Sequence, residues 1–132
     1  MKKEIRRELK ELGVSTVYLF GPRASQSQSR LSDVDIGVVL KKPPLEGDTR
    51  PTYDGLYRLF TEVYPASRLD IVFLQTAPVA LQYSAVKEGK ILFEEGPVFT
   101  ADYEYSVINQ YLDFRPVLDR FDQVAMERYA KT

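Results

Sequence analysis

Short apolar runs alternate with segments of helical periodicity, and this alternation constrains the fold more than any other feature of the sequence. Strand-like runs rich in β-branched and aromatic residues lie at 17–20, 34–40, 68–74 and 90–93. Apolar residues at helical spacing mark 1–12, 53–64 and 76–87. We expect Thr76 to be the N-cap of the third helix. The pattern over residues 1–95 predicts an α/β (α+β) fold with helices packed on a sheet.

The segment 97–132 has helical spacing on both sides of Pro116, which predicts two helices broken near that proline. It carries seven of the sixteen aromatic residues and six acidic against four basic side chains. These aromatics either belong to the core of this chain or form a partner surface that would suit a basic protein. For such a surface the candidates are Phe114, Arg115 and Arg120.

Composition limits the chemistry that the chain can perform. It has 132 residues, which fits one domain (1–132), and it contains no Cys, His or Trp. Disulfides, thiolate nucleophiles, Cys/His zinc sites and histidine bases are therefore excluded, and the oxygen ligands that remain favour Mg²⁺. The net charge of -1 argues against nonspecific nucleic-acid binding. Because no apolar run approaches the roughly 20 residues of a membrane span, we expect a cytoplasmic protein with no membrane contact.

Two aspartates stand at the start of the apolar run 34–40, and a third interrupts the run 68–74. Side chains alternate along a strand, so Asp33, Asp35 and Gly37 share one face, where Gly37 leaves room beside the acids. If the two strands are neighbours, Asp70 joins them at one edge of the sheet. Like charges so placed raise one another's pKa values unless a cation compensates, which suggests one or two Mg²⁺ ions and phosphoryl or nucleotidyl transfer.

A glycine turn at Gly21 ends the first strand and supplies a candidate phosphate-binding loop. Backbone N–H groups in such a turn point toward a bound phosphate, and Arg23 adds a positive charge, while Ser25 offers a hydroxyl. Simpler readings stay open for single residues. Asp33 alone could cap a turn, and Arg23 and Ser25 could be solvated loop residues.

Gly21, followed after position 22 by ten residues and then Asp33-Val34-Asp35, resembles the G-S-x10-D-x-D signature of polymerase-β-like nucleotidyltransferases. With the stretches KEGKILFEEG and YLDFRPVLDRF, nearly the whole chain resembles the minimal nucleotidyltransferase (MNT) antitoxins that pair with HEPN-domain toxins. The resemblance implies a small mixed β-sheet flanked by helices, with a catalytic core at 1–96 and a C-terminal helical segment at 97–132.

The resemblance also implies an activity and a site. Asp33 and Asp35 would bind Mg²⁺ together with ATP, and Asp70 would complete the metal site and help to deprotonate the attacking hydroxyl. In that family AMP is transferred to a tyrosine of the partner toxin, an RNase, and pyrophosphate leaves. A hetero-oligomer with a cognate HEPN-domain toxin is therefore expected.

This chain departs from the signature at one position of the expected nucleotide-binding loop, because Pro22 stands where the family has Ser. Proline offers the phosphates neither a hydroxyl nor an N–H, which could weaken binding by a few kcal/mol. A catalytically weakened antitoxin that neutralises its toxin by binding alone is thus the alternative. A nucleotidyltransferase acting on a small molecule is a third hypothesis.

Overall fold

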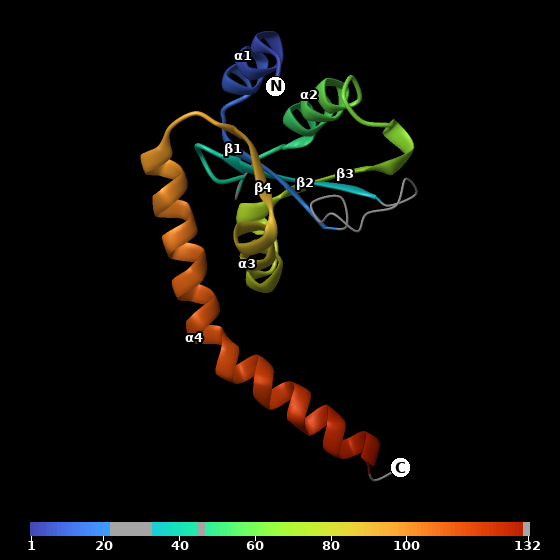
Figure 1. Ribbon diagram of the computed structural model, residues 1–132, viewed down its shortest axis with the longest axis vertical. Coiled ribbons are helices and arrows are strands. Elements are labelled where there is room, and N and C mark those ends of the chain that lie inside the picture. Colours follow the sequence, from blue (N-terminus) through green and yellow to red (C-terminus); the bar gives the residue numbers. More distant parts are fainter. Residues whose placement is uncertain (22–32, 45–46, 131–132) are drawn as a thin grey trace.

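The computed structural model describes residues 1–21, 33–44 and 47–130, which form one sheet with helices on both faces (Figure 1). The main elements are α1 (Lys3–Glu11), β1 (Val14–Phe20), β2 (Val34–Leu40), α2 (Arg50–Phe60), β3 (Leu69–Phe73), α3 (Val79–Glu88), β4 (Lys90–Glu94) and α4 (Pro97–Ala130). Short 3-10 turns, η2 (Ala66–Arg68) and η3 (Leu74–Thr76), precede and follow β3.

The strands form a mixed sheet in the order β3-β2-β1-β4. β1 is antiparallel to both β2 and β4, whereas β2 and β3 are parallel. The expected small mixed sheet flanked by helices is therefore confirmed. The parallel pair matters most for function, because it carries the acidic residues of both predicted strands.

Each face of the sheet has its own apolar core. Val34, Ile36 and Val38 of β2 lie in the larger cluster, with Leu9 of α1 and Phe60 of α2. The opposite face carries a smaller cluster composed of Tyr18, Phe20, Val39, Leu74 and Ala85, with Tyr103 of α4 packed against it. Helices α1 and α2 thus cover one face, and α3 with the first part of α4 covers the other, as Figure 1 shows. Strand alternation places Asp35 of β2 on the α3/α4 face.

β1 is longer than the predicted strand 17–20, because it begins at Val14 and includes Ser15 and Thr16. Both hydroxyl residues are buried, with exposed fractions of 1% and 0%. The hydroxyls of Thr16 and Thr100 are hydrogen-bonded at 2.9 Å, and those of Ser15 and Thr16 lie 3.3 Å apart. A hydroxyl that finds a partner can be buried at little cost, which is why these polar residues belong to a core strand.

Two helix starts differ from the sequence prediction. α2 begins at Arg50 rather than near residue 53, with Pro51 in its first turn, where a proline removes no helical hydrogen bond. The N-cap prediction for Thr76 is wrong: Thr76 ends η3, its hydroxyl donates to the Phe73 carbonyl at 3.2 Å, and Pro78 holds the N-cap position of α3.

The predicted break near Pro116 is also wrong, since α4 is one continuous helix of 34 residues. An internal proline removes a single N–H, here the one that would bond to the Leu112 carbonyl, and the helix tolerates this by bending. Figure 1 shows α4 changing direction in its middle. Despite the length of α4, none of the helices in the described part of the chain is apolar enough to cross a bilayer.

Candidate active site at the start of the parallel strands

Asp35 and Asp70 are direct neighbours across the parallel strands. They occupy the second positions of β2 and β3, and their Cα atoms are register partners. Register partners on parallel strands project to the same face of the sheet, so both carboxylates lie on the α3/α4 face. The Asp35 side chain is half-buried and that of Asp70 is exposed. The expectation that these two strands are neighbours is therefore confirmed.

Asp33 immediately precedes β2 and is exposed, two residues before Asp35. The pKa of Asp35 is raised above its usual value, first by burial, then by the charge of Asp70 and then by that of Asp33. Both neighbouring acids are thus close enough to act on Asp35. In the absence of a cation, this carboxyl takes up a proton more readily than an ordinary aspartate.

Gly21 lies against Asp35 at the end of β1. Phe20 is the register partner of Asp35, and Gly21 follows with φ +78, in the left-handed region. A Cβ atom at Gly21 would collide with Oδ2 of Asp35. The backbone conformation favours glycine, and any larger residue would also have to displace the Asp35 carboxylate from its present position. The predicted turn glycine therefore directly adjoins the half-buried acid.

Gly37 has a different role from the one expected. It shares the face of Asp35, but a Cβ atom there would lie 2.8 Å from Cδ1 of Leu74, a buried residue of η3. The missing side chain makes room for the Leu74 packing contact rather than for a ligand beside the acids. This contact seats the segment that follows β3 against β2.

Three other predicted site residues, Pro22, Arg23 and Ser25, lie outside the described residues. Their assignment to the nucleotide-binding loop stays a prediction. The described residues that adjoin this loop are Gly21 on one side and Asp33 on the other, so both of its ends are at the acidic cluster.

The donor atoms at this edge suit Mg²⁺, which prefers carboxylate oxygens. Within the described residues, however, no group of three or more acidic side chains already has the arrangement of a metal site. The pKa of Asp35 is raised first by burial and then by the charges of Asp70 and Asp33, and a cation would offset the effect of those two charges. The three aspartates therefore have suitable ligand atoms for a divalent cation and lie near one another. Their side chains do not yet have the geometry of a coordination site.

Sequence reasoning missed the contacts that fasten α4 to the sheet and to α3. The Tyr18 hydroxyl of β1 donates to Oε1 of Glu104 in α4 at 2.8 Å, and the Tyr103 hydroxyl donates to Oε1 of Gln82 in α3 at 2.9 Å. A tyrosine within a strand predicted to be buried was the available signal, because a buried tyrosine hydroxyl usually needs a partner.

The mixed sheet, the acid pair on its parallel strands and the adjoining glycine turn define a nucleotidyltransferase-type domain. A family model described as polymerase beta, nucleotidyltransferase, matches residues 3–97 of the sequence. The chain therefore belongs to the polymerase beta nucleotidyltransferase family. No curated protein sequence matches it.

Solved structures with the same fold come from toxin–antitoxin complexes. A chain of a toxin–antitoxin complex with AMP-PNP superimposes with a TM-score of 0.74 at 22% identity, covering 93% of this chain and 96% of that one. A chain from a mutant of the MntA–HpeT toxin–antitoxin gives 0.73 at 21%, with the same coverage. A chain from the complex of a tri-AMPylated Shewanella oneidensis HEPN toxin with an MNT antitoxin gives 0.65 at 20%, covering 96% and 99%. At these identities the matches establish the fold.

Proposed function

We propose that this chain is an antitoxin of the MNT type that binds Mg-ATP and transfers AMP to a tyrosine of a HEPN-domain RNase toxin. The observation that carries the proposal is the acidic pair Asp35 and Asp70, in register on adjacent parallel strands beside Gly21. Similarity to a complex holding AMP-PNP and to one holding a tri-AMPylated HEPN toxin supports both the nucleotide and the partner. The cytoplasm, where ATP is available, is the proposed location.

In this proposal the three aspartates have different roles. Asp33 and Asp35 hold the cation, and Asp70 completes its site. A bound Mg²⁺ would neutralise the crowded carboxylates and stabilise charge on the phosphates. The phenol oxygen of the acceptor attacks the α-phosphorus of ATP, a new P–O bond forms, and the bond to the leaving pyrophosphate breaks. Asp70, the exposed member of the pair, receives the phenol proton and passes it to solvent.

Tyrosine is a suitable acceptor for such a site. Its hydroxyl has a pKa of about 10, so it is mostly protonated at neutral pH and gains from a nearby base. Asp70 faces solvent on the open edge strand β3, where a protein substrate could approach it. A substrate of the size of a folded toxin is thus compatible with the position of the acids.

A second function, neutralisation of the toxin by binding alone, is favoured by one specific observation. Pro22 replaces the serine of the family signature and removes two hydrogen-bond donors from the expected phosphate loop. Catalysis could then be lost while the fold and the partner surface remain. The two functions differ in whether AMP reaches the partner.

The deciding experiment uses the purified chain, Mg²⁺, ATP labelled in its α-phosphate and a separately purified HEPN-domain protein encoded beside this chain. The enzymatic function predicts label on a tyrosine of that protein, lost with Asp33→Ala or Asp35→Ala. Asp54→Ala is the matched control, because Asp54 is an exposed aspartate of α2, which covers the other face of the sheet. Tight binding with no transfer of label would support neutralisation by binding alone.

A further inference from the structure

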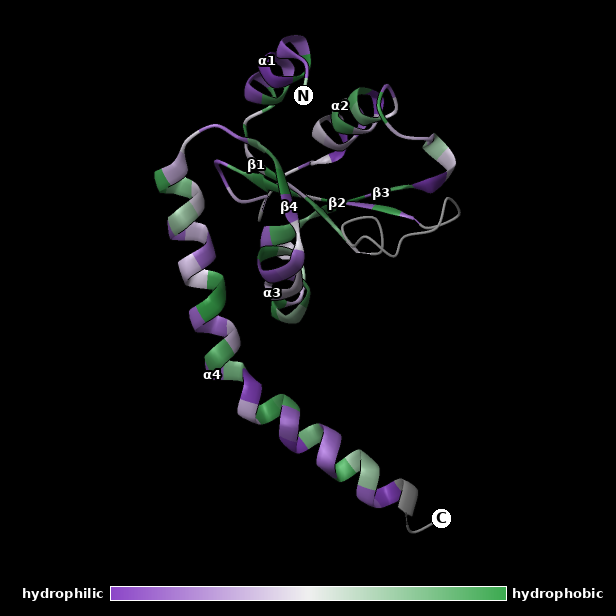
Figure 2. Ribbon diagram, viewed as in Figure 1, coloured by the Kyte–Doolittle hydropathy of each residue, from purple (hydrophilic) through white to green (hydrophobic). Residues whose placement is uncertain are grey.

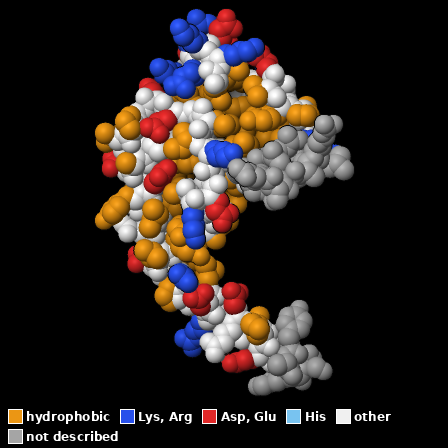
Figure 3. All heavy atoms as spheres, viewed as in Figure 1, with side chains coloured by type: hydrophobic (Ala, Val, Ile, Leu, Met, Phe, Trp, Pro, Cys, Tyr) orange, Lys and Arg blue, Asp and Glu red, His pale blue; other side chains and the backbone are white. Residues whose placement is uncertain are grey.

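Helix α4 has two parts that differ in their contacts. In the first part, Thr100 and Val107 are buried, and the rings of Tyr111 and Tyr83 of α3 stack with centroids 3.8 Å apart. Beyond Tyr111 the environment changes: from residue 112 to residue 128, every side chain except Leu118 is exposed. We call residues 112–128 the arm. Figure 3 shows it extending beyond the body of the molecule.

The arm keeps the apolar face with which α4 packs on the body. Val107, Phe114 and Phe121 are seven residues apart, so they lie on nearly the same side of the helix. Their exposed fractions are 1%, 43% and 69%, in that order. Val117 and Val124 complete a spacing of three and four residues, which is the pattern of a helix that packs against another helix. Figure 2 shows apolar positions recurring along this part of α4.

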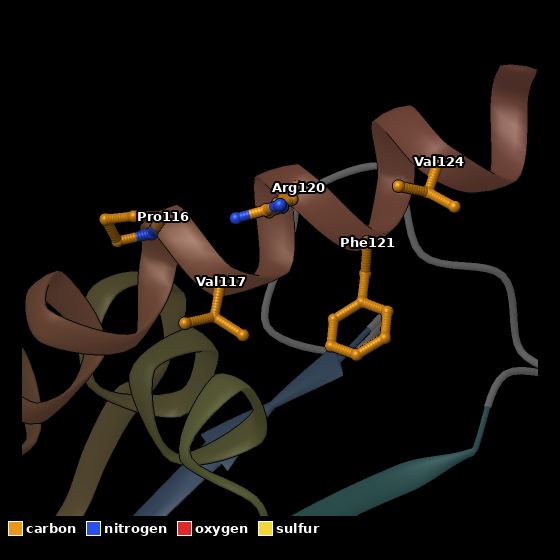
Figure 4. A pocket seen from close by; sticks show the side chains of 5 residues that line it. All are labelled: Pro116, Val117, Arg120, Phe121 and Val124. Atoms are coloured by element: carbon orange, nitrogen blue, oxygen red, sulfur yellow. The ribbon is translucent and has the colours of Figure 1, made fainter.

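Part of this apolar face, Val117, Phe121 and Val124, lines a shallow groove along the arm together with one cationic side chain. Its lining consists of Pro116, Val117, Arg120, Phe121 and Val124. In Figure 4 the side chains of Val117 and Phe121 point from α4 toward the side on which α3 and the sheet are drawn. The groove therefore has an apolar floor that faces the body and a guanidinium group at its margin.

The arm also lies on the side of the sheet that bears the acids. Asp35 and Asp70 project from the face that α3 and α4 cover, and the arm continues α4. In Figure 1 the arm runs toward the side of the molecule on which β2 and β3 begin. A protein that is seated in the groove and large enough to extend to the start of β2 and β3 would meet the exposed carboxylate of Asp70 there.

We propose that the arm is the docking site for the protein substrate, which contributes an amphipathic helix with an acidic residue beside its apolar stripe. The apolar stripe packs on Val117, Phe121 and Val124, and the acidic residue meets Arg120. The docked protein extends from the arm to the acids and presents its acceptor hydroxyl there. This inference rests on the proposed function, since it names the surface that brings the acceptor to the site.

The size of the stripe argues against a second copy of this chain as the occupant. From Phe114 to Val124 the stripe is about 16 Å long. Two copies of the chain that paired only through this stripe would bury roughly a few hundred Å² of surface in total. A stable protein–protein interface buries about 1,200 Å² or more. A partner that covers both the arm and the carboxylate edge has a larger area available.

The test compares two single substitutions of the full chain. Phe121→Asp places a charge in the stripe, and Met126→Asp places the same charge at a residue about 140° away around the helix. The two side chains have similar exposed fractions, 69% and 73%, so both variants should fold, which circular dichroism checks. Binding of the purified HEPN-domain protein is measured by calorimetry, and Mg-ATP binding by equilibrium dialysis.

We expect Phe121→Asp to weaken partner binding by about 30-fold or more, the scale of an aromatic hot spot. Met126→Asp should change it by no more than about 2-fold. Mg-ATP binding should be the same in all three proteins. If the two substitutions weaken partner binding equally, or if neither weakens it, the docking site is overturned. AMP transfer by the wild-type chain is measured separately and does not depend on this result.

Two other outcomes separate the docking site from its alternatives. In the first, the wild-type chain binds the partner but transfers no AMP to it, and Phe121→Asp weakens that binding. This result would overturn the enzymatic function and retain the docking site. The isolated chain is also sedimented. A wild-type dimer that becomes a monomer with Phe121→Asp would assign the stripe to a second copy and overturn the proposal.

Discussion

Replacing Glu104 with alanine is expected to destabilise the protein more than replacing Tyr18 with phenylalanine, although both changes remove the same hydrogen bond. The bond joins the Tyr18 hydroxyl to Oε1 of Glu104 over 2.8 Å. Tyr18 is only 1% exposed, whereas Glu104 is half-buried. Loss of Glu104 therefore leaves a buried hydroxyl without a partner, while loss of the hydroxyl leaves a carboxylate that water can reach.

The magnitudes follow from this asymmetry. An unsatisfied buried donor costs about 1–3 kcal/mol, and a bond to a charged group contributes about 1.5–3 kcal/mol, so we expect Glu104→Ala to cost about 2–3 kcal/mol. Tyr18→Phe should cost about 1 kcal/mol, since its carboxylate can be hydrated instead. For a domain of this size the first change lowers Tm by roughly 6–12 °C and the second by roughly 3–4 °C.

Thermal and urea unfolding of the two variants measure these differences, with Tyr105→Phe as the control. The Tyr105 side chain is 71% exposed on the same helix, so removal of its hydroxyl should change stability by less than about 0.5 kcal/mol. A Tyr18→Phe variant as unstable as Glu104→Ala, or more so, would refute the argument that burial of the donor sets the cost.

Three further predictions test the site and the tyrosine core. Gly21→Ala should destabilise the fold by about 2–3 kcal/mol, and Gly13→Ala by about 1 kcal/mol. Both glycines have positive φ, but only at position 21 would the added Cβ atom have other atoms within 4 Å, so equal losses of stability would contradict the argument. Burial, followed by the neighbouring carboxylates, raises the pKa of Asp35, so the stability of the metal-free protein should fall as the pH rises above about 4. Asp35→Asn should abolish that fall and should also weaken Mg-ATP binding. Burial likewise raises the pKa of Tyr18 and Tyr103, so the contribution of these two tyrosines to stability should be constant below about pH 10 and should be lost as the pH rises above it. The alkaline decline should be less steep in Tyr18→Phe, and an unchanged alkaline slope in that variant would argue against the effect.

The sequence alone determined the order of most strands and helices along residues 1–96 and which residues of a strand share a face. Alternation along β2 separated Val34, Ile36 and Val38 from the acids, and the structure places these residues in the core beneath α1 and α2. This succeeds because strand and helix periods are local properties of the backbone. The resemblance to a known signature added the mixed topology, which periodicity does not contain.

Contacts between distant residues decided the rest. The hydroxyls of Ser15 and Thr16 can be buried in β1 because Thr16 bonds to Thr100 of α4 and Ser15 bonds to Thr16. Gly37 proved to accommodate Leu74, and α4 continues through Pro116 although proline usually stops a helix. Local propensity is weak beside such tertiary contacts, so it could not identify these features.

For the site, the sequence supplied three aspartates and a glycine, and the tertiary structure decided how they meet. Register across β2 and β3 sets Asp35 beside Asp70, and the turn at Gly21 brings backbone against Asp35. The pairing of β2 with β3 joins residues more than thirty positions apart, and no local period encodes it. The arm is a similar case. Its apolar spacing is visible in the sequence, but only the tertiary structure shows that these residues extend beyond the rest of the protein and are therefore exposed.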